Sequence, residues 1–270
     1  MYFHSVIQNL RITLIQSNLH WENIPANLEM FWNKIASVDE TNLIALPETF
    51  TTGFSMDPKF AELMDGVTVN WMKETAAKKN CVVCGSLMIN DEGKFYNRFI
   101  WMKPDGEFFT YDKRHLFCIS DEPKFFTAGR ERLIVELNGW RICPLICYDL
   151  RFPVWARNHN EEYDILLYVA NWPERRRTAW TTLLPARAVE NQAYVIGVNR
   201  VGIDEKGITH TGDSMVIDAL GKILYSKEND EGIFTVELNY DELQKVRAQL
   251  PFLRDADDFI LNQKQKIKSH

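Results

Sequence analysis

A layered α/β domain is the fold class that the sequence predicts. Short apolar runs with the character of strands alternate with segments of helical spacing along most of the 270 residues. Several strand-like runs are apolar at nearly every position, which is typical of strands covered on both faces. No repeat, linker or low-complexity segment interrupts the alternation, so we expect a single domain.

The expected strands are short runs of aliphatic, β-branched and aromatic residues that end at a turn or a polar segment. The first, Leu10 to Gln16, reads LRITLIQ, and the second is halted by Pro47. In chain order the expected strands are 10–16, 42–47, 81–88, 95–103, 107–111, 134–137, 140–146, 165–170, 194–200, 214–218 and 232–238.

The expected helices lie between these strands. Leu28, Phe31, Trp32 and Ile35 share one face of the first, because residues three and four apart fall on the same side of a helix. Pro153 suits the first turn of a later one. In chain order the expected helices are 26–38, 69–80, 153–160, 180–191 and 241–250.

Composition and charge narrow the class of protein. The apolar fraction is 46% and the charged fraction 25%, which is close to the average of globular domains. The net charge of −6 gives no reason to expect nucleic acid or an anionic membrane as a partner. No run approaches the roughly 18 apolar residues of a membrane span. We expect an N-terminal extension over 1–9, the folded domain over 10–262 and a C-terminal tail over 263–270.

Five cysteines are an odd number for a disulfide scaffold, so free thiols in a reducing cytoplasm are expected. Cys81 and Cys84 form a C-x-x-C spacing, but in a strand their side chains point to opposite faces. No second pair of zinc ligands stands nearby, so no metal is expected. A non-catalytic metal-binding or redox thiol protein, using Cys81, Cys84 and Cys143, stays open as a remote alternative.

Cys147 is the candidate nucleophile. It ends the apolar run over 140–146 and is followed by the polar segment Tyr148-Asp149-Leu150-Arg151. A thiol at such a strand end is exposed at the edge of the sheet, and the backbone N–H groups of the following turn can face a developing oxyanion. The alternative is a small, inert, buried side chain, which is common for a free cysteine.

Three segments carry a resemblance to a known family. They are LPETFTTGF over 46–54, YDKRHLF over 111–117 and CYDLRFP over 147–153. In this order they resemble the nitrilase superfamily of carbon–nitrogen hydrolases, and most of all its ω-amidase branch. The resemblance extends from about Leu10 to about Leu261. Supporting segments are Tyr96-Asn97-Arg98, Ala170-Asn171-Trp172-Pro173 and Gly212-Asp213-Ser214.

The resemblance implies a fold and a catalytic set. The fold is a four-layer α-β-β-α sandwich of the nitrilase type, often paired into homodimers, with no cofactor. The general base falls on Glu48, the lysine on Lys113 and the nucleophile on Cys147. The second glutamate of the family falls on Glu122, with the adjacent Asp121 as a competing position. The backbone N–H of Tyr148 would join Lys113 in stabilising the oxyanion.

These residue types fit the chemistry. A thiol with a pKa near 8.5 is mostly protonated at pH 7, so a carboxylate that accepts its proton accelerates attack. Taken singly, Glu48 and Glu122 would suit an exposed loop or turn, and Lys113 a surface charge. His115 is expected to support the lysine, and Asp149 and Arg151 are expected to form an ion pair that shapes the turn after Cys147.

The predicted activity is hydrolysis of the terminal amide of a small dicarboxylic acid monoamide, of the 2-oxoglutaramate or succinamate type. A nitrilase or an N-carbamoyl amide hydrolase of the same superfamily is the alternative. The substrate carboxylate calls for a cation, and arginine matches its shape. The candidate substrate-binding residues are Arg175, Arg176, Arg177, Phe117 and Trp172.

Overall fold

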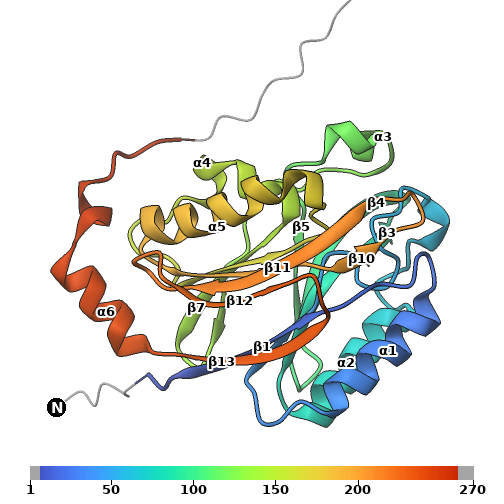
Figure 1. The fold of residues 1–270 in the computed structure, drawn as a ribbon, viewed down its shortest axis with the longest axis horizontal. Coiled ribbons are helices and arrows are strands. Elements are labelled where there is room, and N and C mark those ends of the chain that lie inside the picture. The colour runs from blue at the N-terminus through green and yellow to red at the C-terminus, as the bar shows by residue number, and fades with distance from the viewer. Residues whose placement is uncertain (1–6, 261–270) are drawn as a thin grey trace, which may run out of the picture.

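Two β-sheets stand face to face between two layers of helices in the computed structural model, which describes residues 7–260 (Figure 1). Strand β1 (Leu10–Gln16) of one sheet contacts two strands of the other, β9 (Tyr194–Val198) and β11 (Thr209–Ile217). The expected four-layer α-β-β-α sandwich is confirmed. The tail expected over 263–270 and residues 1–6 of the expected extension lie outside the described residues.

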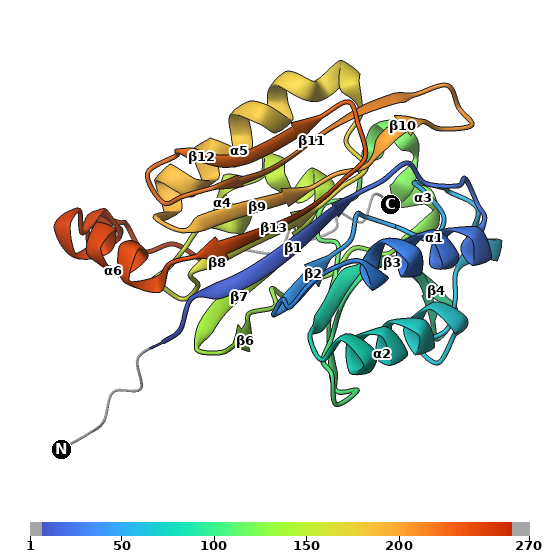
Figure 2. The same cartoon turned by 60° about the horizontal axis from the view of Figure 1, so that its bottom comes forward.

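The first sheet has the strand order β13-β1-β2-β3-β4-β5. Strands β1, β2 and β3 run parallel, and the other neighbours are antiparallel. Helices α1 (Ile24–Ala36) and α2 (Val67–Lys79) cover its outer face (Figure 2). The remaining strands are β2 (Leu43–Ala45), β3 (Val82–Asp91), β4 (Lys94–Met102), β5 (Phe108–Asp112) and β13 (Gly232–Leu238).

The second sheet has the order β10-β11-β9-β8-β7-β6, with β12 paired to β11. Its centre is again parallel, from β7 to β9. Helix α5 (Arg177–Asn191) packs on β9 and β11. The other elements are α3 (Glu122–Phe125), β6 (Val135–Leu137), β7 (Trp140–Ile146), α4 (Pro153–Ala156), β8 (Ile165–Val169), β10 (Val201–Ile203), β12 (Ile223–Glu228) and α6 (Tyr240–Gln249).

The apolar strands supply both faces of the core, as their sequences predict. In β1, Ile12 and Leu14 belong to the cluster that includes the second sheet, whereas Ile15 packs under α1 and α2. Cys84 and Cys81 divide between the same two clusters, because successive side chains of a strand point to opposite faces. The expected separation of this cysteine pair is therefore confirmed.

Several elements differ from the prediction, among them α3, which was not expected, and β11, which begins at Thr209 and not at residue 214. The helix expected over 153–160 ends at Ala156, because the buried Asn158 side chain donates to the carbonyls of Tyr163 and Asn191 and holds the chain extended. Strands β10 and β12 were not expected. The side chains of β12 are exposed or half-buried, so its sequence lacks the apolar run that marks a covered strand. None of the helices within residues 7–260 has the length and apolar character needed to cross a membrane.

Candidate active site

Cys147 occupies a strained turn at the end of β7. Its φ is +45°, in the left-handed region that residues other than glycine rarely adopt. The chain passes there from the strand into a 3-10 helix over Cys147–Arg151. The predicted sharp turn is confirmed. The side chain is only 9% exposed, yet it lines a pocket, so the thiol is accessible from one side only.

The other candidates reach the same place because strand ends converge. Glu48 follows β2 and Asn171 follows β8, and both strands are parallel members of their sheets. Lys113 directly follows β5, which is antiparallel to β4, as β4 is to β3, and therefore runs in the direction of β3. Carboxyl ends of strands that share a direction meet at one edge of a sheet, where sites commonly form.

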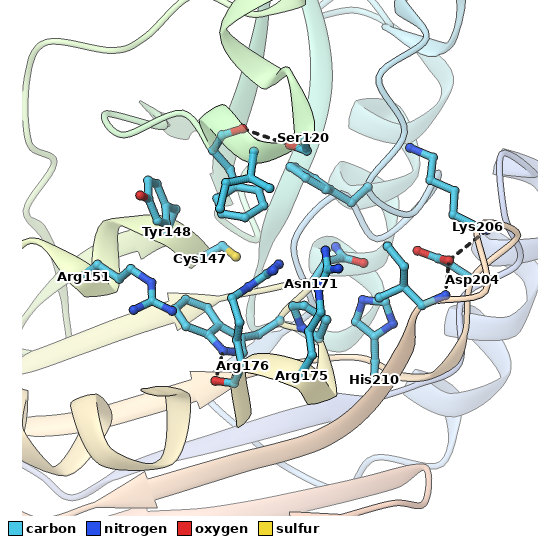
Figure 3. Close-up of a pocket in the computed structure, with 16 residues that line it drawn as sticks. Ser120, Cys147, Tyr148, Arg151, Asn171, Arg175, Arg176, Asp204, Lys206 and His210 are labelled. Carbon is cyan, nitrogen blue, oxygen red and sulfur yellow. Dashed lines mark hydrogen bonds between the residues drawn. The ribbon is translucent and has the colours of Figure 1, made fainter. Parts of the chain in front are cut away.

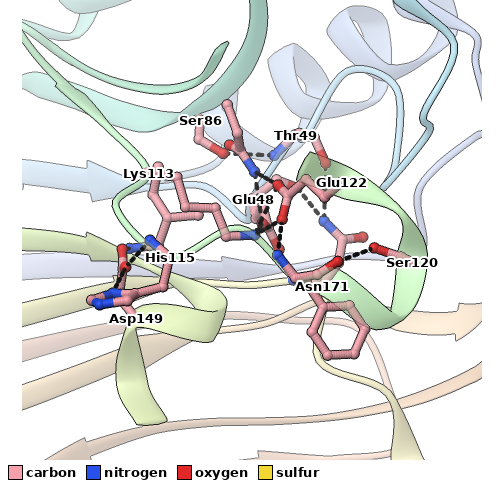
Figure 4. Close-up of polar contacts among 12 residues, drawn as sticks. Glu48, Thr49, Ser86, Lys113, His115, Ser120, Glu122, Asp149 and Asn171 are labelled. Carbon is pink, nitrogen blue, oxygen red and sulfur yellow. Dashed lines mark hydrogen bonds and ion pairs between the residues drawn. The ribbon is translucent and has the colours of Figure 1, made fainter. Parts of the chain in front are cut away.

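Lys113 lies between two carboxylates (Figure 4). Its Nζ is 2.8 Å from Oε1 of Glu48 and 3.0 Å from Oε2 of Glu122. All three side chains are fully buried, so the readings of Glu48 and Glu122 as exposed loop residues and of Lys113 as a surface charge are wrong. The competing Asp121 is exposed and pairs with the exposed Lys124 instead.

Two asparagines complete this cluster. The Asn97 amide donates to Oε1 of Glu48 at 2.8 Å and to Oε1 of Glu122 at 3.3 Å. The backbone N–H of Asn171 donates to Oε2 of Glu48 at 2.8 Å, and its side chain donates to the Glu48 carbonyl. Both asparagines lie in segments that carry the family resemblance, but neither was predicted to have a role, because an uncharged asparagine gives no signal of its own in the sequence.

Burial and charge set the protonation of the cluster. Burial opposes the charged form of Lys113, but the carboxylates of Glu122 and Glu48 outweigh it and raise the pKa of the lysine. Burial raises the pKa of Glu122, Lys113 lowers it, Glu48 raises it, and the net direction is upward. Two carboxylates thus share one ammonium, and Glu122 holds a proton more readily than an exposed glutamate.

The Cys147 thiol is kept neutral until it reacts. Burial raises its pKa well above the ordinary value, and the charge of Glu48 and a hydrogen bond with Glu48 act in the same direction. Lys113 and the backbone of Asn171 oppose this. A protonated thiol beside a carboxylate can transfer its proton to that carboxylate during nucleophilic attack.

Asp149 joins the lysine segment to the cysteine turn. Its carboxylate accepts from the Tyr111 hydroxyl at 2.7 Å and from the backbone N–H of Ile146 at 3.1 Å. It also accepts from the backbone N–H of His115 at 2.9 Å and contacts the His115 ring at 2.8 Å. Because these partners flank Lys113 and Cys147 in the chain, Asp149 holds the two side chains at a fixed separation.

The prediction of an ion pair between Asp149 and Arg151 is wrong. Asp149 is already saturated by the four contacts above, whereas the guanidinium of Arg151 lies 5.0 Å from the ring centre of Trp172 and faces the pocket. The His115 ring contacts Asp149 and stacks on Phe152, with ring centres 3.6 Å apart.

The pocket beside Cys147 has a volume of about 210 Å³ and is rich in cations (Figure 3). Phe117 and Trp172, both expected there, form part of its wall. Arg176 lies over the Phe117 ring at 4.6 Å, and its backbone carbonyl accepts from the Trp172 indole at 2.8 Å. Burial lowers the pKa of Arg176, and the nearby charges of Arg175 and Arg151 lower it further.

The structure separates the three consecutive arginines. Arg175 and Arg176 line the pocket, and no carboxylate within residues 7–260 forms a salt bridge with either. Arg177 begins α5 and forms salt bridges with Asp213, at 2.7 Å, and with Glu228. The expectation that Arg177 lies among the substrate-binding residues is therefore corrected, since its charge is neutralised outside the pocket.

None of the other four cysteines lines the pocket. Cys81, Cys84 and Cys143 are buried, and burial raises the pKa of each thiol. Cys118 is exposed. Across the part of the chain that the structure describes, no group of three or more His, Cys, Asp or Glu side chains is arranged to hold a metal ion.

Comparison with known proteins decides the family. The sequence profile of the carbon–nitrogen hydrolases matches residues 11–248. The chain belongs to this family. It therefore acts on non-peptide carbon–nitrogen bonds, and its resemblance to the nitrilase superfamily is confirmed. A solved carbon–nitrogen hydrolase superfamily protein from Xanthomonas campestris, with an arsenic adduct in its active site, superposes with a TM-score of 0.93 at 42% identity. That match covers 94% of this chain and 100% of the other.

Two relatives of the hydrolase carry more specific names. It is 46% identical to the omega-amidase YafV of Escherichia coli strain K12, over 93% of this chain and 98% of that protein. It is 34% identical to the 2-oxoglutaramate amidase of Bacillus subtilis strain 168, over 79% of this chain and 84% of that protein. The similarity to the ω-amidase branch is confirmed.

Proposed function

We propose that this hydrolase removes the terminal amide of a small dicarboxylic acid monoamide, of the 2-oxoglutaramate or succinamate type, through a thioester on Cys147. The observation that carries the proposal is a buried Glu48–Lys113–Glu122 cluster beside a thiol, at a pocket whose arginines have no carboxylate partner. The names of the omega-amidase and 2-oxoglutaramate amidase relatives support the same substrate class.

In the proposed first step, Glu48 accepts the thiol proton while Sγ of Cys147 attacks the amide carbonyl. Lys113 and the backbone N–H of Tyr148 stabilise the oxyanion. An ammonium group has three N–H donors. One points to Glu48 and one is shared between the two oxygens of Glu122, which leaves the third for the oxyanion. Collapse of the tetrahedral adduct breaks the C–N bond, and ammonia leaves with the proton held by Glu48.

In the second step, Glu48 takes a proton from water, whose oxygen attacks the thioester. The C–S bond breaks, and the proton returns to the Cys147 thiol as the acid product leaves. The overall reaction converts amide and water to carboxylate and ammonium. Glu122 orients Lys113 and the substrate amide, and Asn97 holds both glutamates in place for this.

The substrate carboxylate binds at Arg176, with Arg175 beside it. Burying an anion without a partner is costly, and these two guanidinium groups line the pocket without forming a salt bridge to any carboxylate of residues 7–260. Phe117 packs against Arg176 and Trp172 packs against Arg151, and the two rings cover the short carbon chain of the substrate. Arg177 is left out of this site because Asp213 neutralises it.

Replacing Arg176 by Met is expected to reduce catalytic efficiency toward a monoamide acid by roughly tenfold to a hundredfold, the effect of losing one charge-assisted hydrogen bond. The neutral methyl ester of the same acid should lose much less. The measurement is kcat/KM for both compounds. Arg177→Met is the matched control and should keep the parent's preference for the acid. Equal effects of the two substitutions would place the carboxylate elsewhere.

Replacing Glu122 by Ala is expected to lower kcat by at least about a hundredfold, because Lys113 loses the partner that orients it. Asp121→Ala is the matched control, since Asp121 is exposed and bonded only to a surface lysine. Its kcat should stay within about twofold of the parent, as for most surface substitutions. A larger loss from Asp121→Ala than from Glu122→Ala would transfer the role to Asp121.

The experiment that tests the activity is ammonia release from succinamate, 2-oxoglutaramate, glutamine, a simple nitrile and an N-carbamoyl amino acid. Turnover of the two monoamide acids above the others supports the proposal. Preference for the nitrile or the carbamoyl compound would favour the nitrilase or N-carbamoyl hydrolase alternative, which uses the same catalytic set. The expected homodimer, the cytoplasmic location and the domain limits stay predictions, and sedimentation of the purified protein checks the first.

A further inference from the structure

A histidine that the proposed reaction does not use lies in the pocket wall. His210 belongs to β11 and lines the pocket together with Arg175 and Arg176 (Figure 3). It is only 5% exposed. Its Nδ1 is buried and has no hydrogen-bond partner within residues 7–260. A buried polar atom without a partner destabilises the fold, so this ring is a candidate contact for a bound molecule.

The His210 ring is neutral at physiological pH. Burial and the nearby charge of Arg200 lower its pKa to about 4, against the opposing influence of Asp204 and of the backbone at Gly202 and Ile208. Asp204 also lines the pocket, and its Oδ1 accepts from the backbone N–H groups of Lys206 and Ile208, both at 2.9 Å. A neutral imidazole offers one N–H donor and one acceptor nitrogen.

The guanidinium groups and the neutral imidazole of the pocket suit two different parts of one ligand. Guanidinium groups match a carboxylate, whereas a neutral N–H donor matches an uncharged carbonyl oxygen. A 2-oxo acid carries these two groups on adjacent carbons. A 2-amino acid instead carries an ammonium beside the carboxylate, which the charges of Arg175 and Arg176 would repel.

We infer that His210 donates a hydrogen bond to the 2-oxo oxygen of a 2-oxo acid amide while Arg175 and Arg176 hold the adjacent carboxylate. His210 is then the residue that distinguishes 2-oxoglutaramate from glutaramate, which has the same length but lacks the oxo group. This inference rests on the proposed function. A site with a buried donor rejects an analogue that lacks the acceptor, because the donor is then left unpaired.

The test compares His210→Leu with His210→Asn, two substitutions of nearly equal shape of which only the second keeps an N–H donor. The quantity measured is the ratio of kcat/KM for 2-oxoglutaramate to that for glutaramate, which does not depend on the fraction of enzyme that is folded. His210→Leu should lower this ratio roughly three- to tenfold, the effect of one neutral hydrogen bond. His210→Asn should keep more of it.

The matched control is His159→Phe, which replaces a histidine outside the pocket and should leave the ratio at the parent value. A parent that hydrolyses neither acid would contradict the proposed function and this inference together. A parent that hydrolyses both, with the same ratio in His210→Leu, would overturn the role of His210 alone. Equal losses in His210→Leu and His210→Asn would also overturn it, since shape and not hydrogen bonding would then matter.

Discussion

Replacing Cys147 by Ala is expected to abolish ammonia release, with a loss of at least about a thousandfold in kcat, because no other group can form the thioester. The fold should persist, since a smaller side chain fits a position that is 9% exposed at a pocket wall. The measurement is ammonia release from a monoamide acid, together with thermal unfolding to verify the fold.

Cys118→Ala is the matched control for this substitution. Cys118 is the exposed cysteine among the described residues, and its loss should leave turnover near that of the parent. The nucleophile assignment would be wrong if Cys147→Ala kept more than about one per cent of the parent's activity. Glu48→Gln should lower the rates of both acylation and deacylation, because the proposed base acts in each step.

Replacing Lys113 by Met is expected to damage both catalysis and stability. The oxyanion loses one donor, which typically lowers kcat about 10²- to 10³-fold. Glu48 and Glu122 would face each other in a fully buried site without a cation. Breaking a buried ion pair by removing one partner typically costs about 3–5 kcal/mol of unfolding free energy. Denaturant unfolding and steady-state kinetics measure the two effects.

The stability loss should depend on pH in a defined direction. Burial and Glu48 already raise the pKa of Glu122, and Lys113 opposes this, so its removal raises that pKa further. A carboxyl whose pKa is higher in the folded than in the unfolded protein stabilises the fold below its unfolded pKa and loses this contribution as pH rises through its folded pKa. Lys113→Met should therefore be least destabilised in acid and most destabilised at neutral pH and above.

The control for this prediction is Lys124→Met, which removes an exposed lysine that pairs with Asp121. Its unfolding free energy should stay within about 0.5 kcal/mol of the parent at every pH, as for most surface positions. The prediction would be contradicted if Lys113→Met lost no more unfolding free energy relative to the parent at neutral pH than in acid. The two carboxylates would then not be buried without a partner.

Much of the fold, and Cys147 as the candidate nucleophile, could be predicted from the sequence itself. Strands such as β1 and β7 agree with the predicted ranges at both ends, because a covered strand is marked by a continuous apolar run. Cys147 was found for a related reason, since the change from an apolar strand to a polar turn is local in sequence. The order of the Glu48, Lys113 and Cys147 segments then carried the family resemblance.

The charge environment of the site was decided only by the tertiary structure. Glu48 and Lys113 are 65 positions apart in the chain, and each alone resembles a surface residue. Their burial follows from the meeting of strand ends of the first sheet with the turn after β7 in the second. Desolvation, which sets the pKa values of Lys113, Glu122 and Cys147, depends on all the neighbours at once and has no counterpart in a sequence segment.

The different surroundings of the consecutive arginines are likewise decided by the tertiary structure. Successive residues point about 100° apart in an α-helix and about 120° apart in a 3-10 helix. The 3-10 helix over Glu174–Arg176 and the start of α5 therefore direct neighbouring side chains to different surroundings. Arg176 faces the pocket, and Arg177 faces Asp213. His210 carries no sequence signal at all, because its role follows from burial beside Arg200 and from a partnerless nitrogen, which exist only once β11 is placed in the sheet.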